Sequence, residues 1–182
     1  MSDALTTLNG TLAAVWSRLE AGATDTNAPA NLPVLATSSA KRGPAARIVV
    51  LRGVDRAASM LTMFTHAGAT KVADLKNDER AELLIWDAPE RFQIRLSVTI
   101  ELIEVDAATW QLLGPGTRLN YAVDPSPGTP IDKPEDAWRA TPEIHQMLQL
   151  QTSIHRIETL HIAPDGLRRA VFEGDTSQWI AP

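Results

Sequence analysis

Residues 91–105, "RFQIRLSVTIELIEV", alternate apolar and polar side chains from Phe92 to Ile100. Successive side chains of a β-strand point to opposite faces of its sheet, so this alternation predicts a strand. One face would carry Phe92, Ile94, Leu96, Val98 and Ile100, and the other Arg91, Gln93, Arg95 and Ser97. The apolar face should meet the core of the protein.

Short segments rich in β-branched residues, separated by turn residues, lie on both sides of this strand. Four more strands are predicted before it, at residues 32–39, 46–54, 60–67 and 81–88, and two after it, at 154–162 and 167–174. Such a series favours an antiparallel barrel or sandwich over parallel βαβ repeats.

Helical patterns precede and interrupt the strands. Apolar residues recur at helical spacing over residues 1–22, which predicts an N-terminal amphipathic helix with Ser2 or Asp3 as cap and Gly22 at its end. Further helices are predicted at 70–80, 106–114 and 142–151, and a Pro- and Gly-rich loop at 124–136. The fold class is therefore mainly β with flanking helices, in a single domain spanning 1–182.

Composition excludes several classes of protein. The chain has 182 residues, 44% of them hydrophobic, no cysteine and a formal net charge of −5. Disulfides, thiolate metal sites and a cysteine nucleophile are excluded, and a cytoplasmic location is expected. An acidic chain without a long basic run is not expected to bind nucleic acid, and no apolar run is long enough for a membrane span.

Two arginines bracket an aliphatic run in "AARIVVLRG", residues 45–53. Burying an unpaired guanidinium is costly, so Arg47 and Arg52 indicate an anionic ligand or side chains that extend into water. Strict alternation sends these two side chains to opposite faces. A shared ligand therefore requires a bulge, or contact from two walls of one pocket.

A second cationic position follows the strand at 60–67. In "MFTHAGATK", residues 63–71, the chain passes through Gly68 into a short helix that carries Lys71 in its first turn. Backbone N–H groups at a helix N-terminus favour anions, and Thr65 and Lys71 beside them suit a phosphate. The alternative is a lysine on a solvated helix face.

Gln93, in the strand at 91–105, can donate and accept hydrogen bonds, as a planar heterocycle requires, or can simply face solvent.

Other common chemistries have no support in the sequence. The histidines at 66, 145, 155 and 161 show no metal-binding spacing, and no serine lies in a nucleophile-elbow motif. We therefore expect no metal site and no nucleophilic hydrolase.

Taken in order, "RIVVLR", "MFTHAGATK" and "LIWDAPERFQIRL", with the ending "IHRIETLHIAPDGLRRAVFEGDTSQWIAP", resemble the pyridoxamine 5′-phosphate oxidase family of FMN-binding split barrels. This resemblance covers roughly residues 30 to 105 and the final 30 residues. It implies a six-stranded antiparallel Greek-key split β-barrel that works as a homodimer with FMN between the subunits. The cofactor-binding residues it implies are Arg47, Val50, Arg52, Phe64, Thr65, Thr70, Lys71, Gln93 and Arg169.

The chain departs from this family at substrate-binding positions. Thr70 replaces a basic residue near the phosphate, and Leu160, Gly166 and Arg168 stand where the oxidase signature has other residues. A substrate other than pyridoxamine 5′-phosphate is therefore expected, and no catalytic residue is identified. Arg118 and Tyr121 are compatible either with ligand contact or with ordinary packing.

Three functions are compatible with these residues. The first is an FMN-dependent oxidoreductase that transfers a hydride or electrons between flavin and a small-molecule substrate. The second is a non-catalytic protein that binds or stores FMN. The third is a small barrel used only for protein or ligand binding.

Overall fold

A computed structural model describes residues 3–39, 43–137 and 141–182. Within these ranges the chain forms a nine-stranded antiparallel sheet with four α-helices and four short 3₁₀ helices. The strands are β1 (Val34–Ser39), β2 (Gly43–Ile48), β3 (Leu51–Asp55), β4 (Met60–His66), β5 (Arg80–Asp87), β6 (Phe92–Glu104), β7 (Met147–Ala163), β8 (Gly166–Glu173) and β9 (Thr176–Ile180). The helices are α1 (Leu8–Thr24), α2 (Thr70–Asn77), α3 (Ala107–Leu112) and α4 (Pro115–Leu119), with 3₁₀ turns at Asp3–Thr6, Pro29–Asn31, Pro134–Asp136 and Ile144–Gln146.

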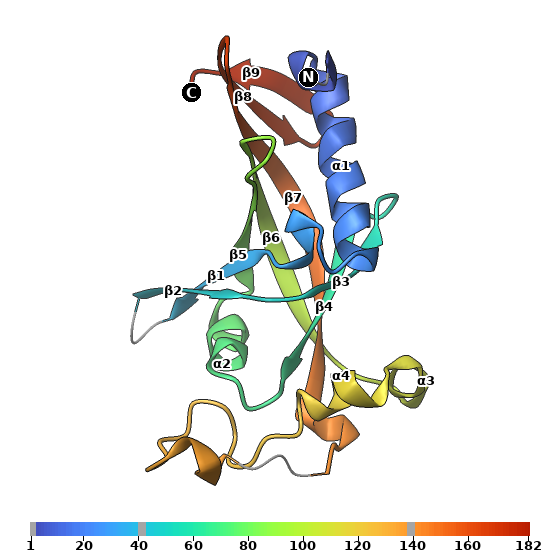
Figure 1. Ribbon diagram of the computed structural model, residues 1–182, viewed down its shortest axis with the longest axis vertical. Coiled ribbons are helices and arrows are strands. Elements are labelled where there is room, and N and C mark those ends of the chain that lie inside the picture. The colour runs from blue at the N-terminus through green and yellow to red at the C-terminus, as the bar shows by residue number, and fades with distance from the viewer. Residues whose placement is uncertain (1–2, 40–42, 138–140) are drawn as a thin grey trace.

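The strand order makes the two edges of the main sheet neighbours in sequence. The order is β2-β1-β5-β6-β7-β4-β3, and the β8–β9 hairpin extends from β7. Only Val49 and Val50 separate β2 from β3. Since one residue spans at most about 3.6 Å, the sheet must curl until its two edges lie close together. The β2 and β3 edges do not pair, so the barrel is open along this seam (Figure 1).

This open antiparallel sheet confirms the predicted fold class. The nine described strands exceed the seven segments that the pattern predicts and the six strands that the resemblance implies, partly because the segment at 46–54 is not one strand. It ends as β2 at Ile48, which pairs with β1, and resumes as β3 at Leu51, which pairs with β4. The last strand, β9, was not predicted.

The alternation in β6 is confirmed. Phe92, Ile94, Leu96, Val98 and Ile100 are each at most 3% exposed, whereas Gln93, Arg95 and Ser97 on the other face are half-buried. We call the side of Phe92 the core face of the sheet and the side of Gln93 its outer face. The central core joins the core face to Val15, Trp16 and Leu19 of α1, which lies along the long strands (Figure 1).

The N-terminal helix forms, but its ends differ from the prediction. It begins at Leu8, and Thr7 is its cap, because the Thr7 hydroxyl accepts a hydrogen bond from the Gly10 N–H at 3.1 Å. Ser2 lies outside the described residues. Gly22 lies inside the helix, where a Cβ would come within 2.5 Å of the Ala30 backbone. Close packing, and not helix termination, therefore requires glycine at this position.

The predicted helix at 142–151 is wrong. Only Ile144–Gln146 form a 3₁₀ turn, and β7 begins at Met147. The start of β7 pairs with β4 on one side and with β6 on the other. Pairing with two strands outweighs the local helical pattern.

No described helix is both long enough and apolar enough to cross a lipid bilayer.

Candidate anion site and outer face

Arg47 lies on the core face at the edge of the sheet. It pairs with fully buried Leu35, and directly opposed residues of an antiparallel pair point to the same face. Its Nη1 donates to the Thr37 hydroxyl at 2.7 Å and to the Leu35 carbonyl at 3.3 Å. Its Nη2 lies 3.7 Å from Oδ2 of Asp74, a buried residue of α2. The guanidinium is thereby aimed at α2.

Lys71 approaches the same place from the first turn of α2. Its Nζ donates to the hydroxyl of Thr65, a buried residue of β4, at 3.0 Å. Burial, and then the charge of Arg47, lower the pKa of Lys71. The positive charges of Arg47 and Lys71 therefore act on each other, and Asp74 is a carboxylate that contacts Arg47. We call Arg47, Thr65 and Lys71 the anion group.

The turn between β4 and α2 adds further polar groups beside Lys71. The cap residue of α2 is Ala69, which has no side-chain hydrogen bond to the helix N-terminus. The Gly68 N–H donates to Nδ1 of His66 at 2.9 Å, so the neutral ring carries its proton on Nε2. This Nε2 is buried without a partner among the described residues. Burial and then Lys71 lower the pKa of His66, which keeps the ring neutral near pH 7. Sequence reasoning gave His66 no role.

Among the contacts that the structure describes, none joins Val50 or Arg52, the other predicted residues near the seam, to the anion group. Val50 lies at the β2–β3 junction and is half-buried. Arg52 is exposed at a shift in register between Leu51 and Gly53, which is the type of bulge that a shared ligand requires. Burial raises the pKa of Tyr121, and the positive charge of Arg52 partly offsets this increase. Arg52 therefore lies near the α4 segment.

Phe64 and Thr70 flank the anion group. Phe64 precedes Thr65 in β4 and is half-buried, so alternation turns its side chain away from the face of Thr65. Thr70 is the exposed first residue of α2.

Gln93 and Arg169 lie on the outer face, in one row across the sheet. Gln93 pairs with Trp86 and Leu160, and Leu160 pairs with Arg169. Arg47 is on the core face, so a single chain presents Gln93 and Arg169 on the opposite side of the sheet. The structure therefore divides the predicted site into two groups.

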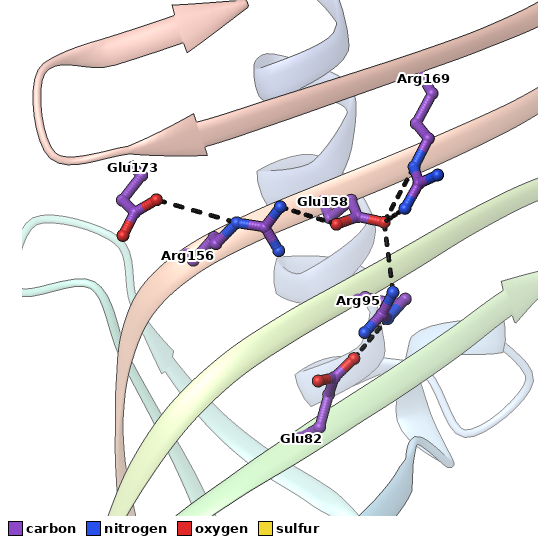
Figure 2. Close-up of polar contacts among 6 residues, drawn as sticks. All are labelled: Glu82, Arg95, Arg156, Glu158, Arg169 and Glu173. Atoms are coloured by element: carbon purple, nitrogen blue, oxygen red, sulfur yellow. Dashed lines mark hydrogen bonds and ion pairs between the residues drawn. The ribbon is translucent and has the colours of Figure 1, made fainter. Parts of the chain in front are cut away.

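Arg169 is held in an ion-pair network around Glu158 (Figure 2). Glu158 is 5% exposed, and its Oε1 accepts from Nε and Nη2 of Arg169 at 3.0 and 2.6 Å. Arg95 and Arg156 also pair with Glu158, at 3.2 and 2.8 Å, and Arg95 pairs with Glu82. Burial alone would raise the pKa of Glu158, but hydrogen bonds from Arg169 and Arg156 and the charge of Arg95 lower it.

Among the described residues, no three His, Asp or Glu side chains are grouped so that they could hold a metal ion.

Comparison with known proteins gives one family match. Residues 13–104 match the family described as pyridoxamine 5′-phosphate oxidase, FMN-binding domain. No curated protein matches the chain.

Solved structures of low sequence identity share the fold. A pyridoxamine 5′-phosphate oxidase-related, FMN-binding protein from Nostoc punctiforme PCC 73102 has a TM-score of 0.76 at 22% identity, over 95% of this chain and 96% of that one. PhzG from Burkholderia lata 383, in complex with tetrahydrophenazine-1-carboxylic acid, has a TM-score of 0.70 at 17% identity, over 94% and 91%.

The depressed pKa of Lys71 predicts a specific pH dependence of stability without ligand. Charged Lys71 is disfavoured in the folded state, and this penalty is relieved as pH rises through the folded-state pKa toward the usual lysine value. The difference between the unfolding free energies of the wild type and of Lys71→Gln should therefore rise as the pH increases toward 10.5. Urea denaturation over this pH increase measures the difference. A flat or falling difference would show that Lys71 is not destabilised by its surroundings.

Glu158 should be essential for stability, because three arginines share it. Glu158→Gln should lower the unfolding free energy by about 3–5 kcal/mol, the usual cost of breaking a buried ion pair from one side. The matched control is Glu173→Gln, which removes a mostly exposed carboxylate 3.8 Å from Arg156 and should cost less than about 1 kcal/mol. Equal effects of the two substitutions in chemical denaturation would contradict this account of the network.

Proposed function

The chain belongs to the pyridoxamine 5′-phosphate oxidase FMN-binding domain family, and on this premise we propose that it binds FMN and acts as an oxidoreductase. The observation that carries the proposal is the approach of Arg47 and Lys71 to each other beside α2, where Arg47 contacts Asp74 and its charge acts on Lys71. Two adjacent cations destabilise each other unless an anion lies between them.

The residues of the anion group fit a flavin phosphate. Arg47 and Lys71 supply charge, the Thr65 hydroxyl supplies a polar contact, and the first N–H groups of α2 lack a side-chain cap. Charge-assisted hydrogen bonds to such a phosphate are worth about 1.5–3 kcal/mol each. Val50, Arg52, Phe64 and Thr70 surround this group along the chain and are proposed to line the rest of the site.

A second copy of the chain is proposed to supply Gln93 and Arg169. These residues cannot reach a ligand on the core face of their own sheet, so they would meet the FMN bound to a partner subunit. Apolar side chains on the same outer face support this arrangement: Ile48, Leu84 and Trp86 are 64%, 37% and 46% exposed. Contact between this outer face and the partner subunit would cover them.

Bound FMN supplies hydride or electron transfer, and the protein supplies binding and orientation. Gln93 can hydrogen-bond to the edge of a planar ring, and Glu158 holds the Arg169 guanidinium through two of its nitrogens. The proposed substrate is a small molecule other than pyridoxamine 5′-phosphate, because Leu160, Gly166 and Arg168 replace the residues of the oxidase signature.

We further propose that the protein acts in the cytoplasm, in keeping with its lack of cysteine. Cell fractionation that finds the protein outside the cytoplasm would contradict this location.

FMN affinity tests the phosphate site. Arg47→Ala and Lys71→Ala should each weaken FMN binding by about 1–3 kcal/mol, or roughly 5- to 150-fold, through loss of charge-assisted contacts. Arg80→Ala is the matched control, since its side chain is 81% exposed and paired with Asp78, and it should bind FMN normally. Fluorescence quenching of added FMN measures the three constants. Wild-type affinity in both site variants would place the phosphate elsewhere.

Reduction of the bound flavin tests the catalytic proposal. The FMN-loaded protein should lose its yellow absorbance when mixed under nitrogen with at least one of NADH, NADPH or a reduced organic substrate, and should regain it in the presence of an acceptor. Stopped-flow absorbance follows both steps. A flavin that no such reductant bleaches would favour FMN storage instead.

The outer face should mediate dimer formation. Trp86→Glu introduces a charge at an apolar position of this face and should shift the protein to a monomer that binds FMN weakly, because the partner's Gln93 and Arg169 are lost. Leu112→Glu on α3 is the control, since Leu112 is 88% exposed and lies outside the sheet. Light scattering gives the masses. A wild-type monomer that binds FMN tightly would disprove the site between subunits.

A further inference from the structure

A cavity of about 570 Å³ lies at the end of the sheet where the first 3₁₀ turn is beside the β8–β9 hairpin (Figure 1). Three turns form its walls: the 3₁₀ turn Asp3–Thr6, the β5–β6 turn and the β7–β8 turn. Its described lining contains no residue of the anion group, and neither Gln93 nor Arg169. Sites for small molecules measure about 300–1,000 Å³. The cavity therefore has the size of a ligand site that is separate from the proposed flavin site.

His161 places one wall of the cavity on the core face of the sheet. It pairs with fully buried Phe92 of β6 and with Arg168 of β8, and opposed residues of an antiparallel pair point to the same face. Arg169 is the next residue of β8, so it points to the outer face instead. This wall and the row containing Gln93 and Arg169 therefore lie on opposite sides of the sheet.

The imidazole of His161 is a neutral group without a hydrogen-bond partner. Burial and then the charge of Arg168 lower its pKa, while Glu90 and Asp165 act in the opposite direction. The ring is therefore neutral near pH 7, with one N–H and one lone pair. Its Nδ1 is buried, and neither ring nitrogen has a partner within the described ranges. Because an unpaired buried N–H is costly, the proton is expected on Nε2, which can donate it to a ligand.

The charged side chains in the cavity walls leave one anion and one cation unpaired. Arg168 and Asp165 pair with each other through Nη2 and Oδ2. Glu90 and Arg91 also line the cavity, and their side chains make no hydrogen bond or ion pair in the part of the chain that the structure describes. The Glu90 carboxylate is close enough to His161 to act on its pKa. The cavity thus presents a free carboxylate beside a free guanidinium.

The backbone of the β5–β6 turn fixes the position of Arg91. Its φ is +49°, a conformation that residues with large side chains rarely adopt. The Arg91 N–H donates to the Ala88 carbonyl at 3.2 Å, and the Arg91 carbonyl accepts from the Ile162 N–H at 3.0 Å. The second bond ties this turn to β7. Rarely adopted conformations of this kind are frequent at ligand-binding sites.

We propose that this cavity binds an α-amino acid with an apolar side chain. The ammonium group of the ligand pairs with Glu90, and its carboxylate pairs with Arg91 and accepts from Nε2 of His161. Its side chain packs on apolar parts of the wall, among them Leu5 and Ile162. A ligand with a single charge leaves Glu90 or Arg91 unpaired, whereas a zwitterion satisfies both. This site goes beyond the proposed flavin chemistry and does not depend on it.

Three related compounds test the requirement for both charges. L-Phenylalanine carries an ammonium group and a carboxylate, phenethylamine carries only the ammonium group, and 3-phenylpropanoate carries only the carboxylate. Isothermal titration calorimetry of the full chain should show that phenylalanine binds at least about 10-fold more tightly than either analogue, because one charge-assisted contact is lost in each.

Two variants should divide the analogues between the two charges. Glu90→Gln should weaken binding of phenylalanine and phenethylamine about 5- to 20-fold and leave 3-phenylpropanoate unaffected. Arg91→Asn should weaken binding of phenylalanine and 3-phenylpropanoate and leave phenethylamine unaffected, and asparagine tolerates a positive φ. The matched controls are Glu20→Gln and Arg80→Asn, at exposed positions outside the cavity, which should bind all three compounds normally.

A steric variant tests the cavity itself. Ala163 lines the wall and is half-buried, so Ala163→Leu fills part of the space and should weaken binding of all three compounds. Ala58→Leu, at an exposed turn position outside the cavity, should not. Circular dichroism of each variant checks that the fold is retained.

Several outcomes would overturn the amino-acid site. They are no binding of phenylalanine by the wild type, equal affinity for phenylalanine and either analogue, and normal phenylalanine binding by both Glu90→Gln and Arg91→Asn. A phenylalanine dissociation constant that rises in proportion to added FMN would place both ligands in one site and would also overturn it. Failure of the wild type to bind FMN would overturn the proposed function alone.

Discussion

The short junction at Val49 and Val50 is the constraint on which the rest of the structure depends. It ties β2, at one edge of the sheet, to β3 at the other, so the sheet must curl into an open barrel. In the curled sheet, Arg47 contacts Asp74 of α2, and Lys71 of the same helix contacts Thr65 of β4. It also leaves the row containing Gln93 and Arg169 on the outer face. One chain therefore holds two halves of a site that face away from each other.

Much of the fold could be predicted from the sequence, because local patterns and burial agree along most strands. The alternation in β6 is the clearest case, since each of its apolar side chains is buried. The β2–β3 break was missed because Val49 and Val50 are apolar and β-branched, and no turn residue marks the change of partner. The helix expected at 142–151 failed because β7 gains two paired neighbours, which a local pattern cannot reveal.

The candidate site could be predicted only where its residues lie in one motif. Arg47 and Lys71 were identified from short segments, and the structure brings them together. The separation of Gln93 and Arg169 depends on how the whole sheet curls, so it could not be predicted from either strand alone. His66 gave no signal, because Ser126, which packs against its turn, lies 60 residues further along the chain. Electrostatic repulsion at Lys71 is likewise a product of the fold.

Subunit complementation tests the central claim most directly. Lys71→Ala impairs the anion group and Gln93→Glu impairs the outer face, so dimers of either variant alone have two damaged sites. A mixed dimer, isolated with two affinity tags, combines the intact anion group of one subunit with the intact outer face of the other. It should bind one FMN per dimer with wild-type affinity. A mixed dimer that binds FMN no more tightly than its parents would contradict a site shared between subunits.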